Sequence, residues 1–198
     1  TGAYTADFSD DYSVFDPANL AKYDAVVLNN TTGLKFPDPE KKQALLDFVA
    51  KGKGLIGIHA ATDCFYDWPD AAAMVGGLFD GHPWGGNGTW AFKIEDPTHP
   101  LNRAWGGKGF KLQDEIYQFK TPYTRADRRV LVGLDLSDPV TGGVKQGVKR
   151  TDGDFAVAWI KKQGQGRVFY CSLGHADNVF QDAAVVRFYL DGIQYALG

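Results

Sequence analysis

Two short apolar runs, separated by a helical pattern, constrain the fold of this chain most. "DAVVLN" (Asp24 to Asn29) and "GLIGIH" (Gly54 to His59) are rich in Val, Leu and Ile, which is typical of strands buried in a parallel sheet. Between them, "DPEKKQALLDFVAKGKG" has Pro39 at a first helical position, apolar residues at helical spacing and glycines at its end. Strand, helix and strand in this order predict a right-handed parallel crossover.

The remaining segments extend this α/β pattern. Strands are predicted over residues 3–11, Thr89–Glu95, Phe110–Phe119 and Arg129–Leu136. A hairpin with its turn at "KKQGQG" is predicted between Asp154 and His175, and "PANLAKY" predicts a short helix. A last amphipathic helix is expected from Asp182 to Leu197, with Val185, Val186, Phe188, Tyr189 and Ile193 as its buried stripe. No repeat or linker interrupts the chain, so we expect one α/β domain over residues 1–198.

Charge and cysteine content exclude several classes of protein. The 21 Lys and Arg residues are scattered among 24 Asp and Glu residues, and the net charge of −3 argues against binding to nucleic acid or to an anionic membrane. The longest apolar runs are strand-sized, so no membrane insertion is expected. Cys64 and Cys171 make neither a disulfide framework nor a structural zinc site. A cytoplasmic and an exported location both stay open.

Two of the four histidines follow predicted strands. His59 ends the "GLIGIH" run, and His175 ends the second arm of the hairpin. Loops at the carboxyl ends of parallel strands converge on one edge of the sheet, where α/β proteins build ligand sites. Both residues are therefore candidates for chemistry, although a hydrogen-bonded packing role stays open for each.

Aromatic residues near His82 suggest a sugar site. In "FDGHPWGGNGTW", Trp84 can offer a flat apolar face to a pyranose ring, and the Phe65–Trp68 loop is similar in character. A glycine-rich turn packed by a core Trp is the alternative. His99, in "DPTHPL", is expected in a turn.

Adjacent carboxylates occur in "LQDEIYQF". Side chains alternate along a strand, so Glu115 and Tyr117 share one face while Asp114 and Ile116 share the other. Ile116 is the better core residue, which favours Glu115 for a pocket, where a carboxylate can orient imidazole or act as a base. An exposed pair is the alternative. Asp63 follows His59 on the next loop, and Cys64 is expected to be a buried thiol rather than a nucleophile.

Seven segments in order resemble the ThuA-like domain, a family named from trehalose utilisation. They are "YDAVVLNNTTG", "FVAKGKGLIGIHAATDCFYDWP", "GLFDGHPW", "DPTHPL", "DEIYQF", "YTRADRRVLVGLD" and "DGDFAVAWIKKQGQGRVFYCSLGH". The resemblance covers Tyr12 to Gly198. It implies a flavodoxin-like, mostly parallel sheet flanked by helices, as in class I glutamine amidotransferases. Family members usually begin with a further strand, so the first β-strand of that sheet is expected to be absent from this chain.

The same resemblance argues against amidotransferase activity. In the amidotransferases, the turn after this strand presents a cysteine nucleophile, whereas here "GIHAA" holds His59. Cys64 lies five residues too late for that turn. The scaffold is shared and the chemistry differs.

The family association with 3-keto sugars implies a carbohydrate-active protein. A keto group at C3 acidifies the C2 hydrogen, so a base can remove it, the C1 substituent is expelled, and water re-adds. The implied catalytic residues are His59, Glu115 and His175, and the implied substrate-binding residues are Asp63, Trp68, His82, Trp84 and Tyr117. A divalent metal ion held by His59, His82, Glu115 and His175 is an open alternative.

Three other functions stay open from the sequence. The first is a non-catalytic carbohydrate-binding or accessory domain, acting as a homo-oligomer or beside an oxidoreductase partner. The second is a metal-dependent hydrolase of an ester or amide, although no HExxH or other compact metal motif occurs. The third is a structural subunit whose His59 turn has no chemistry.

Overall fold

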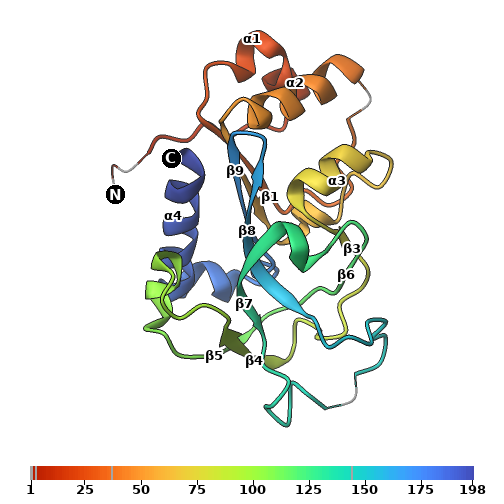
Figure 1. Cartoon of the computed structure of the whole chain (residues 1–198), viewed down its shortest axis with the longest axis vertical. Helices are drawn as coiled ribbons and strands as arrows, with labels where there is room; N and C mark the ends of the chain where they lie inside the picture. Colours follow the sequence, from red (N-terminus) through yellow and green to blue (C-terminus); the bar gives the residue numbers. More distant parts are fainter. Residues whose placement is uncertain (1, 3, 37, 144) are drawn as a thin grey trace.

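The computed structural model describes residues 2, 4–36, 38–143 and 145–198, and a seven-stranded sheet runs through its centre (Figure 1). Its order is β1-β2-β9-β8-β7-β4-β5. These strands are β1 (Ala25–Asn29), β2 (Gly54–Ile58), β9 (Gly166–Cys171), β8 (Ala156–Gln163), β7 (Arg128–Leu134), β4 (Thr89–Ile94) and β5 (Phe110–Gln113). A separate pair joins β3 (Leu78–Phe79) to β6 (Phe119–Lys120).

The sheet is parallel on one side and antiparallel on the other. β1 pairs with β2, and β2 with β9, in parallel, and helix α2 (Pro39–Ala50) links β1 to β2 as the sequence predicts. From the β8–β9 hairpin onward the pairings are antiparallel, because the tight turn after Gln163 reverses the chain. The expected α/β fold is confirmed, and the parallel strands with helices on both faces are consistent with a flavodoxin-like architecture. β1 is one edge of this sheet, and the strand expected before it remains an expectation.

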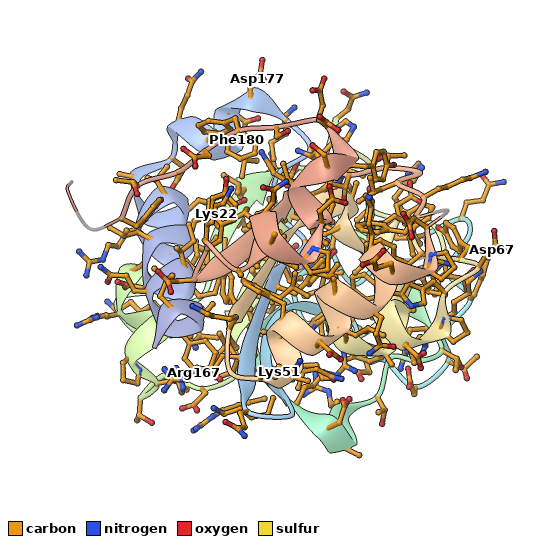
Figure 2. The ribbon with its side chains drawn as sticks, turned by 90° about the horizontal axis from the view of Figure 1, so that it is seen from above. Lys22, Lys51, Asp67, Arg167, Asp177 and Phe180 are labelled. Carbon is orange, nitrogen blue, oxygen red and sulfur yellow. The ribbon has the colours of Figure 1, made fainter. Side chains whose placement is uncertain are left out.

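Helices cover both faces of the sheet (Figures 1 and 2). Helices α1 (Pro17–Leu20), α2 and α3 (Pro69–Val75) lie on one face, and α4 (Ala183–Leu197) lies on the other. Side chains of β9 alternate between the two cores: Val168 and Tyr170 join the cluster under α2 and α3, whereas Phe169 and Cys171 join the cluster under α4. Both faces are thus apolar, which explains the continuous hydrophobic runs in the sequence.

Single turns of 3-10 helix fill several connections. They are η1 (Tyr12–Phe15), η2 (His59–Thr62), η3 (Pro100–Trp105), η4 (Arg125–Asp127) and η5 (Asp177–Gln181). Two of them matter for function, because η2 begins at His59 and η5 follows the loop that carries His175. Within the described part of the chain, no helix is long and apolar enough to cross a membrane.

Three predicted features differ in the structure. The strand expected over residues 3–11 is absent from its described part, Tyr4–Asp11, where Phe8 is 95% exposed and finds nothing to pack against; Ala3 lies outside the described residues. The strand expected over Phe110–Phe119 is split, because residues 114–118 leave the sheet between β5 and β6. In α4, Val186 is 46% exposed instead of buried.

The predicted stripe of α4 is confirmed except at Val186: Val185, Phe188 and Tyr189 are buried, and Ile193 packs against the core. Gly192 rather than Val186 lies against the sheet, where an added Cβ would come within 2.5 Å of the Phe169 ring. Asp191 is also buried, paired with Arg187 one turn earlier. Apolarity alone therefore misplaced only Val186, since a glycine contributes to the close helix–sheet contact without a hydrophobic side chain.

Candidate functional site

His59 occupies a strained turn at the end of β2. Its φ of 47° lies in the left-handed region, which is uncommon for a residue with a side chain. The turn is tight: at Gly57, two residues earlier, an added Cβ would lie 3.0 Å from both the Ala61 side chain and the Tyr170 ring. Such strain at the carboxyl edge of a sheet is typical of functional turns, and here it points a 2%-exposed imidazole into the interior.

One hydrogen bond sets the tautomer of His59. Its Nδ1 lies 2.7 Å from the Ser172 carbonyl oxygen, and since a carbonyl only accepts, Nδ1 carries the hydrogen. The lone pair is therefore on Nε2, which is buried and has no hydrogen-bond partner in the described residues. Burial lowers the pKa of His59 to about 4, so the imidazole is neutral and Nε2 is a free base at neutral pH.

The carboxylate of Glu115 lies among three imidazoles. Its Oε1 is 3.8 Å from His59 Nε2, and its Oε2 is 3.4 Å from His82 Nδ1 and 4.0 Å from His175 Nε2. Glu115 is largely shielded, with 15% of its side chain exposed, while His82 and His175 are half exposed. We call these four residues the Glu115 cluster. They come from four separate parts of the chain, which the fold brings to one edge of the sheet.

Aromatic rings form one wall of the cluster. The Tyr117 ring lies 4.3 Å from the His59 ring and 4.4 Å from the Phe79 ring, and Phe79 in turn stacks against His82 at 5.9 Å. The predicted alternation along this segment is borne out, because Glu115 and Tyr117 both face His59 while Asp114 and Ile116 are buried. The exposed-pair alternative is wrong for Asp114.

The glycine-rich loop approaches the cluster from the other side. At Gly86, an added Cβ would lie 3.1 Å from His175 Nδ1 and 3.7 Å from the Cβ of Glu115. At Gly85 nothing lies within 4 Å of the same position. A single backbone position of this loop therefore touches the imidazole of His175.

Three other residues predicted for the site lie elsewhere or at its margin. Trp84 is a core residue: it is 2% exposed and donates Nε1–H to the Thr141 carbonyl, so neither ring face is free for a sugar. Trp68 is also buried, against Phe36. Asp63, half-buried on the loop after His59, accepts a hydrogen bond from the Tyr66 hydroxyl.

The described residues do not fit the expected metal set. No group of three or more His, Cys, Asp or Glu side chains in the described ranges is arranged to hold a metal ion. In the Glu115 cluster, His59 Nε2 lies nearest Oε1, and His82 Nδ1 and His175 Nε2 lie nearest Oε2. The chemistry below is therefore derived from the protein groups alone.

Cys64 is a buried packing residue, as the sequence predicts, and Cys171 is buried as well. Cys64 is buried, and its burial raises the pKa of the thiol to about 12. Burial likewise raises the pKa of the Cys171 thiol well above its ordinary value. Neither thiol forms the thiolate that amidotransferase chemistry needs at neutral pH.

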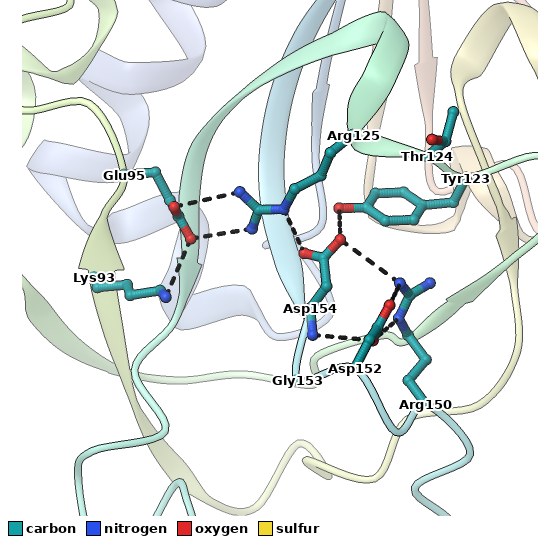
Figure 3. Close-up of a pocket in the computed structure, with 9 residues that line it drawn as sticks. All are labelled: Lys93, Glu95, Tyr123, Thr124, Arg125, Arg150, Asp152, Gly153 and Asp154. Atoms are coloured by element: carbon teal, nitrogen blue, oxygen red, sulfur yellow. Dashed lines mark hydrogen bonds and ion pairs between the residues drawn. The ribbon is translucent and has the colours of Figure 1, made fainter.

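A hollow of about 640 Å³ lies elsewhere on the protein and shares no lining residue with the Glu115 cluster (Figure 3). Its charges pair with one another: Arg125 contacts Glu95 and Asp154, and Arg150 contacts Asp152 and Asp154. Because each of these guanidinium groups already faces carboxylates, this hollow has little charge left for a ligand.

A family model described as ThuA, trehalose utilisation, matches residues 1–196. The chain belongs to the ThuA family. The resemblance inferred from the seven segments is thereby confirmed, and the family description suggests a sugar-related role. No curated protein matches the chain.

Solved structures support the ThuA fold. A ThuA-like protein from Bacteroides uniformis is 23% identical, with a TM-score of 0.74, over 95% of this chain and 75% of that chain. One from Parabacteroides merdae is 21% identical, with a TM-score of 0.69, over 98% and 76%. A β-galactosidase from Bacillus circulans sp. alkalophilus matches 90% of this chain with 22% of its own, at 14% identity and a TM-score of 0.51. At these identities the likeness is one of fold alone.

Sequence reasoning missed two residues that hold the site together. Asp114 is fully buried and accepts hydrogen bonds from the main chain around His175. Asn30, in the left-handed region after β1, donates its side-chain N–H to the Gly174 carbonyl. The only sequence signal for Asn30 is that Asn tolerates a positive φ at a strand end.

Proposed function

We propose that this ThuA family protein processes 3-keto-glycosides by base-assisted elimination followed by addition of water. The observation that carries the proposal is the neutral, buried imidazole of His59, whose unpartnered Nε2 faces the carboxylate of Glu115. A base that abstracts a proton from carbon must be unprotonated and shielded from water before substrate binds. His59 meets both requirements.

In the proposed reaction, His59 Nε2 removes the hydrogen on C2, next to the C3 keto group. The C–H electron pair forms an enediolate whose negative charge is on the C3 oxygen. That pair then expels the oxygen on C1, which leaves as an alcohol after taking up a proton. Water then adds to the resulting double bond. Its hydroxyl bonds to C1, protonated His59 returns its proton to C2, and the remaining proton of the water restores the group that protonated the leaving oxygen, so the net reaction is hydrolysis and His59 is regenerated.

Glu115 has two roles in this scheme. With Oε1 at 3.8 Å from Nε2, its carboxylate stabilises the imidazolium that His59 becomes after proton abstraction. With Oε2 near His82 and His175, it links the buried base to two imidazoles at the mouth of the site. His175 is our candidate for protonating the leaving group, because it is half exposed and lies across Glu115 from His59.

A carbohydrate-binding module without catalysis is the second candidate. The Phe79 ring favours it, because this ring is only partly buried and stacks against His82, and aromatic rings beside hydrogen-bonding side chains are typical of sugar sites. The two tryptophans that first suggested it are buried in the core and give it no support.

The test is an NMR assay of the protein with 3-keto-disaccharides and with their unoxidised parents. We expect release of free 3-keto sugar from the oxidised substrates only. In His59→Asn, release falls by at least about a hundredfold, the usual contribution of a general base. Asn is chosen because it tolerates the positive φ at position 59.

The matched control is His99→Asn. His99 lies away from the cluster, accepts the Leu101 N–H at the start of η3, and Asn serves equally well at such a position. Equal losses in both variants would contradict a role for His59 in the chemistry. Shifts of the Tyr117 ring signals with sugar, but no turnover by the wild type, would favour the binding module.

A further inference from the structure

The main chain that carries His175 is held by side chains from separate segments. We define the His175 loop as residues 172–176, which follow β9. Its carbonyl oxygens at positions 172, 173 and 174 accept hydrogen bonds from His59 Nδ1 at 2.7 Å, the Tyr189 hydroxyl at 2.8 Å and Asn30 Nδ2 at 3.0 Å. Ordering three side-chain donors costs conformational entropy. Three consecutive carbonyls bonded in this way therefore indicate that the loop has a role.

Asp114 supplies the matching contacts on the N–H side of the loop. Its Oδ2 accepts from the N–H of Gly174 at 2.7 Å, and its Oδ1 from the N–H groups of His175 and Ala176, both at 3.1 Å. The carboxylate is fully buried. Burial raises the pKa of Asp114, and the three N–H donors of the loop oppose that rise. The loop thus stabilises the charged carboxylate, and the carboxylate in turn holds the main chain of the loop.

Local interactions alone do not fix the conformation of the His175 loop. Gly174 has a φ of 131°, where an added Cβ would lie 3.0 Å from the Ile58 side chain. Glycine is flexible in the unfolded chain and does not by itself select one conformation. The conformation of the His175 loop therefore depends on the side chains that bond its main chain, among them Asp114 and Asn30.

Asp114 and Glu115 are consecutive residues that face opposite ways. Asp114 holds the main chain of the His175 loop, while the Glu115 carboxylate faces the imidazole of His175. A single peptide unit joins Asp114 to Glu115 and thus fixes both the His175 loop and the Glu115 carboxylate. The 4.0 Å separation between Glu115 Oε2 and His175 Nε2 follows from this arrangement.

We propose that Asp114 is a positioning residue: with Asn30, it fixes the His175 loop so that the imidazole of His175 stands beside Glu115 and His59. This inference rests on the proposed function, in which His175 belongs to the site. The test reads the position of His175 directly and needs no turnover, so it can succeed or fail independently of the 3-keto-sugar chemistry.

The experiment is NMR of the imidazole ring protons in the full chain. The His59 and His175 rings are 5.5 Å apart between centroids, which gives a nuclear Overhauser cross-peak between them. In Asp114→Asn, an amide N–H₂ meets backbone N–H donors, so we expect the cross-peak to be lost while the His99 signals stay in place. An unchanged cross-peak in a folded Asp114→Asn protein would overturn the proposal.

A second variant covers the case in which Asp114→Asn does not fold. Asn30→Gly removes only the donor to Gly174 O, and glycine accepts the φ of 52° at position 30. We expect it to fold and to weaken the same cross-peak; no change there, with Asp114→Asn unfolded, would also overturn the proposal.

Asn178→Ala is the matched control. Asn178 donates its side-chain N–H to the Gln113 carbonyl at 3.0 Å, so this hydrogen bond joins the same two parts of the chain through an atom outside residues 174–176. We expect its His59–His175 cross-peak to equal that of the wild type. An equal loss in Asn178→Ala would mean that any contact between the segments suffices, and that Asp114 has no special role.

Discussion

At the scale of single residues, the environment of each histidine determines its chemistry. His59 is neutral because it is buried, and the Ser172 carbonyl determines which ring nitrogen carries the hydrogen, whereas the side chains of His82 and His175 are half exposed. The lone pair on His59 Nε2 is buried beside the Glu115 carboxylate, while the other two imidazoles are exposed to solvent. The cluster therefore extends from the interior of the protein to its surface. That order is the basis for assigning the base to His59 and the proton donor to the outer imidazoles.

The close approach of Gly86 to the His175 imidazole can be tested with a single substitution. Gly86→Ala places a methyl group 3.1 Å from His175 Nδ1, so the imidazole must move. We expect 3-keto-sugar turnover to fall about tenfold, since displacements of ~1 Å cost up to about a hundredfold in catalysis. Gly85→Ala, with nothing near its added Cβ, should retain wild-type turnover; equal turnover in both variants would contradict the close approach.

At the scale of elements, sequence patterns were sufficient to predict a helix or strand whose determinants lie within one segment. β1, α2 and β2 were predicted because apolar spacing, Pro39 and the terminal glycines all act within one segment. His59 and His175 were predicted as site residues because each follows a strand. Asp114 and Asn30 could not be predicted in their roles, since their partners lie 60 to 62 and 144 residues away and are main-chain atoms that leave no pattern.

Residue type gave wrong predictions where tertiary packing determines the environment of a side chain. Trp84 looked like a stacking surface, yet its ring is buried against Phe155 and its N–H is bonded to the main chain. Val186 looked like a core residue, yet Gly192 makes the close contact with the sheet. Neither outcome follows from hydrophobicity, because both depend on which neighbour the fold supplies.

The start of α4 gives a prediction about one element. Asp182 caps the helix by accepting from the N–H groups of Ala184 and Val185. Asp182→Ala should lower the free energy of unfolding by about 1 kcal/mol, and Asp182→Asn by much less, because Asn caps equally well. Urea denaturation of both variants measures this; equal losses would indicate that the charge, not the cap, matters.

At the scale of the whole molecule, the stability of the fold is linked to the protonation of His59. Unfolding returns its pKa from about 4 to the ordinary 6.5, so the unfolded chain binds a proton first as the pH falls. The neutral buried His59 therefore contributes stability in full above pH 6.5, and this is lost as the pH falls toward 4. The total is about 3 kcal/mol, at about 1.4 kcal/mol per pH unit.

Urea unfolding of the wild type and His59→Asn between pH 4 and 8 measures this linkage. Asn does not titrate, so the difference in free energy of unfolding between the two proteins isolates position 59. We expect the advantage of the wild type to shrink steadily below pH 6.5 and to be constant above it. A difference that is flat across the whole range would mean that His59 titrates alike in both states.

The alternation of Asp114 and Glu115 limits how this chain can vary in length. Because successive side chains here point to opposite sides, inserting a single residue between Gln113 and Asp114, or deleting Gln113, would exchange the two faces. The carboxylate that now holds the main chain would turn toward the histidines, and its neighbour would turn into the core. Two inserted residues would restore the parity. In this segment, then, odd changes of length should be far more damaging than even ones, whatever amino acids they add.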